Sequence, residues 1–151
     1  MRADTELTIR DYTPEDEGFV ARLASDAFLE YTAGAVGHTL SLVRSHTSRV
    51  AVRGERRVGF IAADLQRGEV ATLHAIAVVE HERGRGVGRA LLLDFERLAR
   101  RAGAVRADLC TADSNVAALD LFYKRGFTIV RRRSRFYARG QNACILMKRL
   151  D

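Results

Sequence analysis

The sequence predicts a fold of the α/β class, in its α+β form, in which about four helices flank a central mixed, mostly antiparallel sheet of about seven strands. Strand-like segments outnumber helical ones, and some are joined by short turns while others are joined through a helix. Short turns give antiparallel neighbours, whereas helical crossovers permit parallel ones. The chain has 151 residues and no repeat or low-complexity segment, so we expect a single domain over residues 1–151.

Seven segments have the alternation or the apolar character of strands. The first, ELTIRDY, alternates apolar and polar side chains. Gly54 and Glu55 separate the next two segments, which predicts a β-hairpin. The fourth, VATLHAIAVV, is long and apolar enough for a central strand. The strands are expected over residues 6–12, 49–53, 57–65, 70–79, 105–111, 127–137 and 143–149.

Four segments repeat apolar residues at helical spacing. Thr13 and Pro14 precede the first helix, as a capping hydroxyl and a proline in the first turn. Ser114 is the expected cap of the fourth helix, while Gly103 and Gly126 are expected to end the third and fourth. The helices are expected over residues 14–29, 38–46, 87–102 and 115–125.

The net charge of +6 comes from arginine, because only two of the 25 basic residues are lysines, Lys124 and Lys148. Arginine suits fork-like recognition of phosphate or carboxylate, so the composition favours a polyanionic ligand. One hypothesis is therefore a basic nucleic-acid-binding module. The arginines are scattered, however, and lack interleaved aromatic residues or a helix-turn-helix pattern, which argues against nucleic acid.

The sequence carries no apolar run long enough for a membrane span and no signal-peptide core, so we expect a cytoplasmic protein that does not bind membranes. Cys110 and Cys144 lie far apart in apolar segments, without a metal-ligand spacing. We expect buried, reduced thiols and no metal.

The segment RGRGVGR lies between an expected strand and an expected helix. Its glycines allow a tight turn and a close approach to the backbone, and the first amides of the helix suit an anion. No Lys-Ser/Thr pair follows the glycines and the spacing is not GxGxxG, so a nucleotide-hydrolysing loop and a dinucleotide site are disfavoured. The segment alone leaves two interpretations open: a phosphate site, or a basic turn without a ligand.

The longer segment AIAVVEHERGRGVGRALL resembles motif A of the GNAT (Gcn5-related) N-acetyltransferase family, with Arg83, Gly86 and Gly88 in the family pattern. Asn115 and the Gly126-Phe127 pair continue the resemblance. The last residues resemble the ribosomal-protein-alanine type of protein N-terminal acetyltransferase. That subgroup's catalytic Glu or His, however, matches Cys110 here.

The resemblance implies a transferase that uses acetyl-CoA as co-substrate and moves the acetyl group directly to a primary amine through a tetrahedral intermediate. The acceptor would be a small-molecule amine, a peptide N-terminus or a lysine. The matching residues would bind the pantetheine arm, the pyrophosphate and the rest of the cofactor, with an amide near Val78 stabilising the oxyanion. They are Ile76, Ala77, Val78, Arg83, Gly84, Arg85, Gly86, Val87, Gly88, Arg89, Asn115 and Phe122.

Arylalkylamine acetyltransferases of this family carry histidine at the position of His74, which the resemblance therefore implies as the general base. Strand alternation predicts that its side chain shares a face with Thr72 and Ile76. The alternative is a structural histidine. Phe122 occupies the position where the family often has a tyrosine that acts as the general acid for the departing thiolate. Its neighbour Tyr123 is the first candidate for that role in this chain.

The sequence leaves other points open. Tyr137, Tyr31 or no residue could protonate the departing thiolate in place of Tyr123, and a water chain could replace the base. A catalytically weak acetyl-CoA-binding protein is an alternative to the enzyme. The acceptor and the oligomeric state, a homodimer included, are not determined by the sequence.

Overall fold

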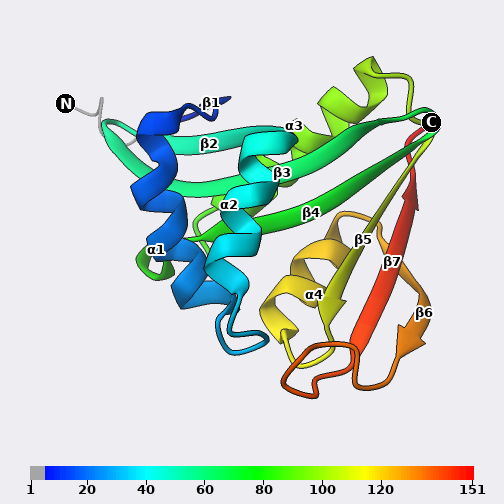
Figure 1. The fold of residues 1–151 in the computed structure, drawn as a ribbon. Coiled ribbons are helices and arrows are strands. Elements are labelled where there is room, and N and C mark those ends of the chain that lie inside the picture. Colours follow the sequence, from blue (N-terminus) through cyan, green and yellow to red (C-terminus); the bar gives the residue numbers. More distant parts are fainter. Residues whose placement is uncertain (1–5) are drawn as a thin grey trace.

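The computed structural model describes residues 6–151, and its seven strands form one sheet in the order β1-β2-β3-β4-β5-β7-β6 (Figure 1). Neighbouring strands are antiparallel except β4 and β5, which are parallel. The predicted mixed, mostly antiparallel sheet is thus confirmed. The strands are β1 (Leu7–Asp11), β2 (Thr47–Arg53), β3 (Arg56–Arg67), β4 (Val70–Val78), β5 (Arg106–Ala112), β6 (Thr128–Arg133) and β7 (Ala143–Arg149).

Helices cover both faces of the sheet (Figure 1). One hydrophobic core packs α1 and α2 on β2, β3 and β4, and a second core packs α3 and α4 on the other face. No helix in residues 6–151 combines the length and the apolar character needed to cross a membrane. The helices are α1 (Glu17–Phe28), α2 (Ala35–Ser45), α3 (Val87–Arg101) and α4 (Val116–Lys124), with short 3-10 turns at Pro14–Asp16 and Glu80–Glu82.

The sheet splits between its two parallel strands. β4 and β5 pair only from Val70 opposite Arg106 to Leu73 opposite Leu109. Beyond this point β4 continues along β3 and β5 continues along β7, and the two strands diverge (Figure 1). The divergence leaves unpaired strand edges on both sides of a gap, and the candidate functional site lies there.

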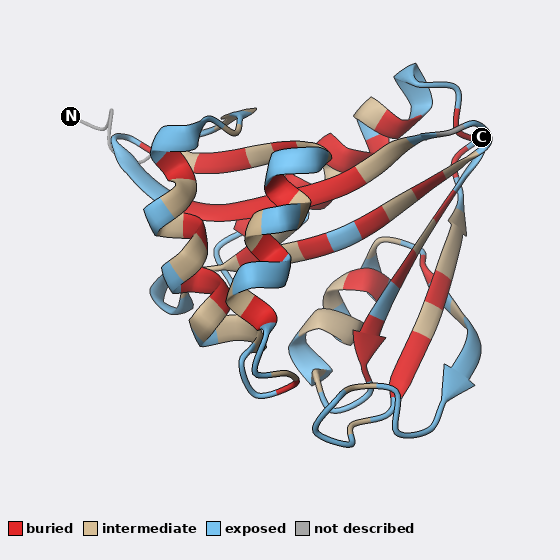
Figure 2. Cartoon of the chain, viewed as in Figure 1, coloured by how far each residue is buried: buried red, intermediate tan, exposed pale blue. Residues whose placement is uncertain are grey.

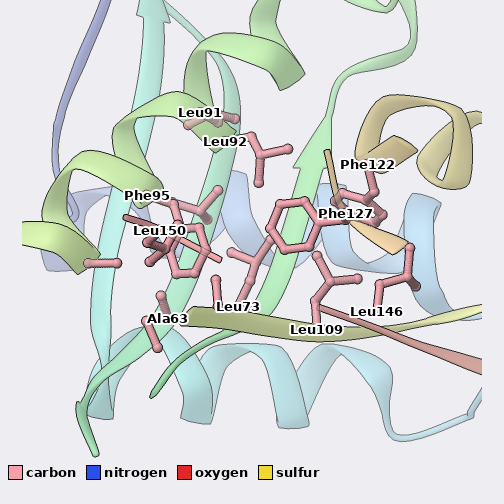
Figure 3. Packing of buried hydrophobic residues seen from close by; sticks show 14 of the residues in the cluster. Ala63, Leu73, Leu91, Leu92, Phe95, Leu109, Phe122, Phe127, Leu146 and Leu150 are labelled. Carbon is pink, nitrogen blue, oxygen red and sulfur yellow. The ribbon is translucent and has the colours of Figure 1, made fainter. Parts of the chain in front are cut away.

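Large side chains fill the core between α3, α4 and the sheet. Figure 3 shows the rings of Phe95, Phe122 and Phe127 among leucines from α3, β4, β5 and β7. Figure 2 shows the result along the sheet, where buried residues alternate with more exposed ones. This alternation follows from strand geometry, since successive side chains point to opposite faces.

Buried carboxylates account for much of the arginine content. Asp16, Glu82, Asp94 and Glu96 are buried, Asp94 nearly so and the other three completely, and each pairs with basic side chains. A buried charge is tolerated only when it is paired and hydrogen-bonded. The partners within hydrogen-bond distance are Arg10, Arg49, Arg53, Arg57, Arg85, Arg97, Arg125 and Lys148.

Three local predictions were wrong. Asn115, not Ser114, is the N-cap of α4, because its Oδ1 accepts the Ala118 N–H at 3.2 Å. β6 ends at Arg133 instead of residue 137, because residues 134–142 form a loop with backbone bonds of its own. The thiol of Cys144 is buried as expected, but Cys110 is exposed, because β5 leaves β4 at this residue.

Candidate functional site

A β-bulge in β4 positions His74. Ala75 lies opposite Ala62 and Leu73 lies opposite Ala63, so His74 has no partner on β3. The extra residue reverses the alternation, since Leu73 packs with the α3 core and Ala75 with the α1–α2 core. Ile76 packs on the α3 side, so the prediction that it shares a face with His74 is wrong.

The His74 side chain lies on the α1–α2 face, where it is exposed within the otherwise buried or half-buried strand β4 (Figure 2). Its ring lies 4.9 Å from the ring of His46, at the end of α2. Partial burial lowers the pKa of His74, and His46 lowers it further, while Asp64 opposes the shift. The neutral imidazole is therefore favoured, and a neutral imidazole can accept a proton.

The edge of β4 that faces the gap offers backbone hydrogen bonds. The Val79 N–H donates to the Val58 carbonyl on β3 at 2.9 Å, so the carbonyl and N–H of Val78 point the opposite way. Ile76 repeats this orientation two residues earlier. Ala77 lies opposite Phe60 and directs its backbone groups to β3. Of the three predicted residues, Ile76 and Val78 thus present amides to the gap.

The glycine segment forms the turn from β4 into α3. Gly84 and Gly86 have φ angles of 76° and 88°, in the region that favours glycine. Gly86 is the N-cap of α3, and the first helical bond runs from the Ala90 N–H to its carbonyl at 3.0 Å. The N–H groups of Val87, Gly88 and Arg89 therefore precede the first helical bond and have no acceptor within the described residues. These N–H groups, at the positive end of the helix dipole, are of the kind that suits an anion.

Gly88 has a packing role as well. A Cβ at this position would lie 3.1 Å from Leu121 Cδ2, so glycine allows α3 to approach α4 closely. This contact fixes the start of α3 against α4. The packing explains the glycine independently of any ligand.

A buried acid organises the arginines of the glycine segment. Glu82 is fully buried and accepts a bond from Arg53 Nε at 3.0 Å and one from Arg85 Nη1 at 3.3 Å. Arg83 Nε donates to the Val78 carbonyl at 3.2 Å, and the Arg83 side chain is exposed. Arg85 is therefore partly neutralised, whereas Arg83 and Arg89 leave positive charge at the surface. Glu82 could not be identified from the sequence, because nothing in the sequence distinguishes this buried acid from the exposed ones.

Asn115 and Phe122 both have structural roles. Asn115 uses its side-chain oxygen as the helix cap, which leaves its NH₂ group without a partner among the described residues. The Phe122 side chain is 2% exposed and its ring lies 6.0 Å from that of Phe127 (Figure 3). It cannot contact a ligand without rearrangement of the core. Tyr123, one residue on, is 48% exposed, and no described side chain bonds to its hydroxyl.

A second tyrosine lies at the point where the strands separate. Cys110 is the first residue of β5 after the last pair with β4, and its Sγ lies 3.7 Å from the Tyr137 hydroxyl. Burial raises the pKa of Tyr137 well above its usual value. The ring of Tyr137 lies 5.4 Å from that of Tyr31. The hydroxyl thus stays protonated beside the gap.

The loop that carries Tyr137 is attached to the segment between α1 and α2. The Arg139 N–H donates to the Tyr31 carbonyl at 3.2 Å, and Gln141 Nε2 donates to the Glu30 carbonyl at 2.8 Å. These bonds join two segments more than 100 residues apart in the sequence. Together they frame one end of the gap.

Comparisons with known proteins agree with this geometry. The sequence profile of the acetyltransferase (GNAT) family matches residues 8–127. No curated protein matches the chain. The crystal structure of Ard1 from Thermoplasma volcanium is 27% identical, with a TM-score of 0.82, over 95% of this chain and 97% of that one.

Two further structures share the fold. The ribosomal-protein-S18-alanine N-acetyltransferase of Escherichia coli is 21% identical, with a TM-score of 0.83, over 97% of this chain and 95% of that one. NAA60 of Arabidopsis thaliana, in complex with acetyl-CoA, is 19% identical, with a TM-score of 0.79, over 95% of this chain and 98% of that one. With the family profile covering most of its length, the chain belongs to the GNAT family of acetyltransferases.

Proposed function

We propose that the protein is an acetyl-CoA-dependent N-acetyltransferase that acetylates a primary amine: a small-molecule amine, a peptide N-terminus or a lysine. The observation that carries this proposal is that two features adjoin each other: the unpaired edge of β4 leads through the glycine turn to the free amides at the start of α3. Acetyl-CoA would supply an acetyl group activated as a thioester. The free amides of α3 suit the pyrophosphate of acetyl-CoA, and the edge of β4 suits its extended amide arm.

Different residues of the site would bind different parts of acetyl-CoA. The amides from Gly84 to Arg89 would hold the pyrophosphate, except that of Arg85, whose N–H donates to the Glu82 carbonyl at 3.3 Å. The space beside Gly84 and Gly86 is open, and Arg83 and Arg89 add positive charge. Ile76 and Val78 would pair with the amide arm along the β4 edge. The free NH₂ group of Asn115 is a further donor.

His74 is the proposed general base, because its ring is accessible at the last β4–β5 pair and bonds to none of the described residues. There it would take the proton from the acceptor nitrogen. The Val78 N–H would stabilise the oxyanion. We assign the proton for the departing thiolate to Tyr137, whose hydroxyl lies at the same point, in preference to Tyr123.

One similar protein bears on the acceptor. The E. coli neighbour is named for the N-terminal alanine of a ribosomal protein, and the tail of this chain resembles that subgroup. Cys110 replaces that subgroup's catalytic acid or histidine, however, and partial desolvation raises the pKa of its thiol, which is therefore a poor base. Both peptides and small amines therefore belong in the acceptor screen.

The test has two stages, both with a chelator present. Thermal unfolding is measured with acetyl-CoA, CoA and ATP, and we expect only the first two to raise the midpoint, since a ligand of the native state stabilises it. Release of CoA thiol is then measured with a panel of amines and peptides. Acetyl-CoA binding without thiol release from any acceptor would support the alternative of a catalytically weak binder. An unchanged midpoint would overturn the proposal.

Variants assign the roles. His74→Gln should lower kcat by about 10²-fold or more while acetyl-CoA binding is kept, and His74→Ala should regain part of its rate with added imidazole. Tyr137→Phe should lower kcat more than the matched Tyr123→Phe. The reverse order would return the acid role to Tyr123.

A further inference from the structure

His46, Asp64 and His74 form a three-residue cluster on the α1–α2 face of the sheet, which we call the two-histidine cluster. One ligand atom from each lies within 4.8 Å of the other two. The residues come from the end of α2, from β3 and from the bulge of β4. Three different elements therefore bring two imidazoles and a carboxylate to one point.

The hydrogen bonds of His46 determine which ring nitrogen is free. Ser45 Oγ donates its proton to the Ser41 carbonyl at 2.7 Å, so the same oxygen acts as an acceptor for His46 Nδ1 at 2.9 Å. The Leu42 carbonyl, 3.2 Å from Nδ1, is also an acceptor. Nδ1 must therefore carry the proton, and Nε2 keeps a free lone pair. A metal-binding histidine has this arrangement, with its other N–H donated to a backbone carbonyl.

The other two members are similarly available. Asp64 Oδ1 accepts the Gln66 N–H at 3.0 Å, which orients the carboxylate and leaves its second oxygen without a partner among the described residues. The His74 ring makes no hydrogen bond there either. His46 and Asp64 line an open hollow of about 550 Å³, which leaves room for water ligands around an ion.

We propose that the two-histidine cluster binds one divalent transition-metal ion, Zn²⁺ being the best fit. Two imidazoles and one carboxylate are ligands that Zn²⁺ accepts, and three protein ligands leave an open position for water. The ion would occupy the lone pair with which His74 accepts a proton. Zn²⁺ would therefore inhibit acetyl transfer, and this second step rests on the function proposed above.

Metal binding is tested first, without reference to activity. Untagged protein is stripped with EDTA and dialysed, and Zn²⁺ is titrated by calorimetry, with Co²⁺ visible absorption as a second readout. We expect one site in the wild type. His46→Gln and Asp64→Asn should each weaken Zn²⁺ binding by about 100-fold. Mutating a residue that only hydrogen-bonds a metal ligand already costs about 10- to 100-fold in affinity, so the loss of a ligand itself should reach at least the upper end of that range. The matched control His81→Gln changes an exposed histidine outside the cluster and should bind like the wild type.

Two results would overturn the metal proposal: no saturable binding to the wild type, or equal affinity in His46→Gln. These measurements do not depend on any acceptor being found. Where acetyl transfer is measured, Zn²⁺ should inhibit the wild type and His81→Gln, and the same concentration should leave His46→Gln active. Equal inhibition of all three would refute the coupling to His74, while the chelator-containing assay would still decide the proposed function.

Discussion

Replacing Gly86 by alanine should separate the ligand role of the glycine segment from its cost in stability. Gly86 caps α3 with a φ of 88°, and no atom lies within 4 Å of the position that a Cβ would take. The substitution therefore creates no clash. Its effect is confined to the backbone, because an L-residue resists this conformation.

The expected magnitude is about 1–2 kcal/mol, the cost of placing one L-residue in the left-handed region. The chain offers a matched control. Gly103 has a φ of 93° and equally open space, but it lies beyond the far end of the 15-residue helix α3. At 1.5 Å per residue the helix alone separates the two glycines by about 22 Å. Gly103→Ala should thus lose as much stability without touching the anion site.

Urea unfolding measures the stability of both variants, and calorimetry measures their affinity for acetyl-CoA. Relaxation of the strained alanine should turn the amides that follow it away from the site, so the acetyl-CoA dissociation constant of Gly86→Ala should rise about tenfold, which corresponds to 1.4 kcal/mol. Gly103→Ala should bind like the wild type. Equal affinity in both variants would refute the assignment of the amides after Gly86 to the pyrophosphate, whatever their stabilities.

Two further predictions concern the buried acids. Glu96 is fully buried and accepts a hydrogen bond from Lys148 Nζ at 2.7 Å. Glu96→Gln should therefore lower the free energy of unfolding, measured in urea, by about 3 kcal/mol. The control Asp120→Asn breaks an exposed ion pair with Lys124 and should leave the free energy of unfolding unchanged. A hydrogen bond from Arg10 holds the pKa of Asp16 below its ordinary value, so the carboxylate stabilises the fold above about pH 4 and this contribution is lost as the pH falls further. The stability difference between the wild type and Asp16→Asn should therefore shrink from pH 7 towards pH 2, and a constant difference would contradict the ion-pair explanation.

The sequence was sufficient for elements whose signals are local. The hairpin of β2 and β3 follows from alternation on both sides of Gly54, and α3 follows from its apolar spacing and from Gly103 at its end. The cap of α4 shows the limit of such signals. Ser114 and Asn115 can both cap a helix, and only the backbone path decides which side chain reaches the Ala118 N–H.

Non-local features could not be predicted. Glu96 lies in an α3 sequence rich in charged residues, and its burial depends on Arg125 and Lys148, which arrive from α4 and β7. The face of the Ile76 side chain depends on a register shift of β4 relative to β3. Alternation within β4 alone placed His74 correctly beside Thr72 but wrongly put Ile76 on the same face. The turn from β4 into α3 was easier to predict, because its glycines are close together in the sequence.

The bulge puts the side chains of His74 and Ile76 on opposite faces of β4. Without the extra residue, regular alternation beyond Leu73 would put Ile76 on the α1–α2 face and Ala75 on the α3 core. With it, Ile76 and Val78 keep their side chains on the core of α3, while His74 projects to the side of α2 and reaches His46. His74, which follows Leu73 by regular alternation, lies where the strands separate and within reach of the two other side chains of the proposed metal site. The proposed acid-base role and the proposed zinc site would compete for one imidazole, so the free zinc concentration would set the fraction of active protein.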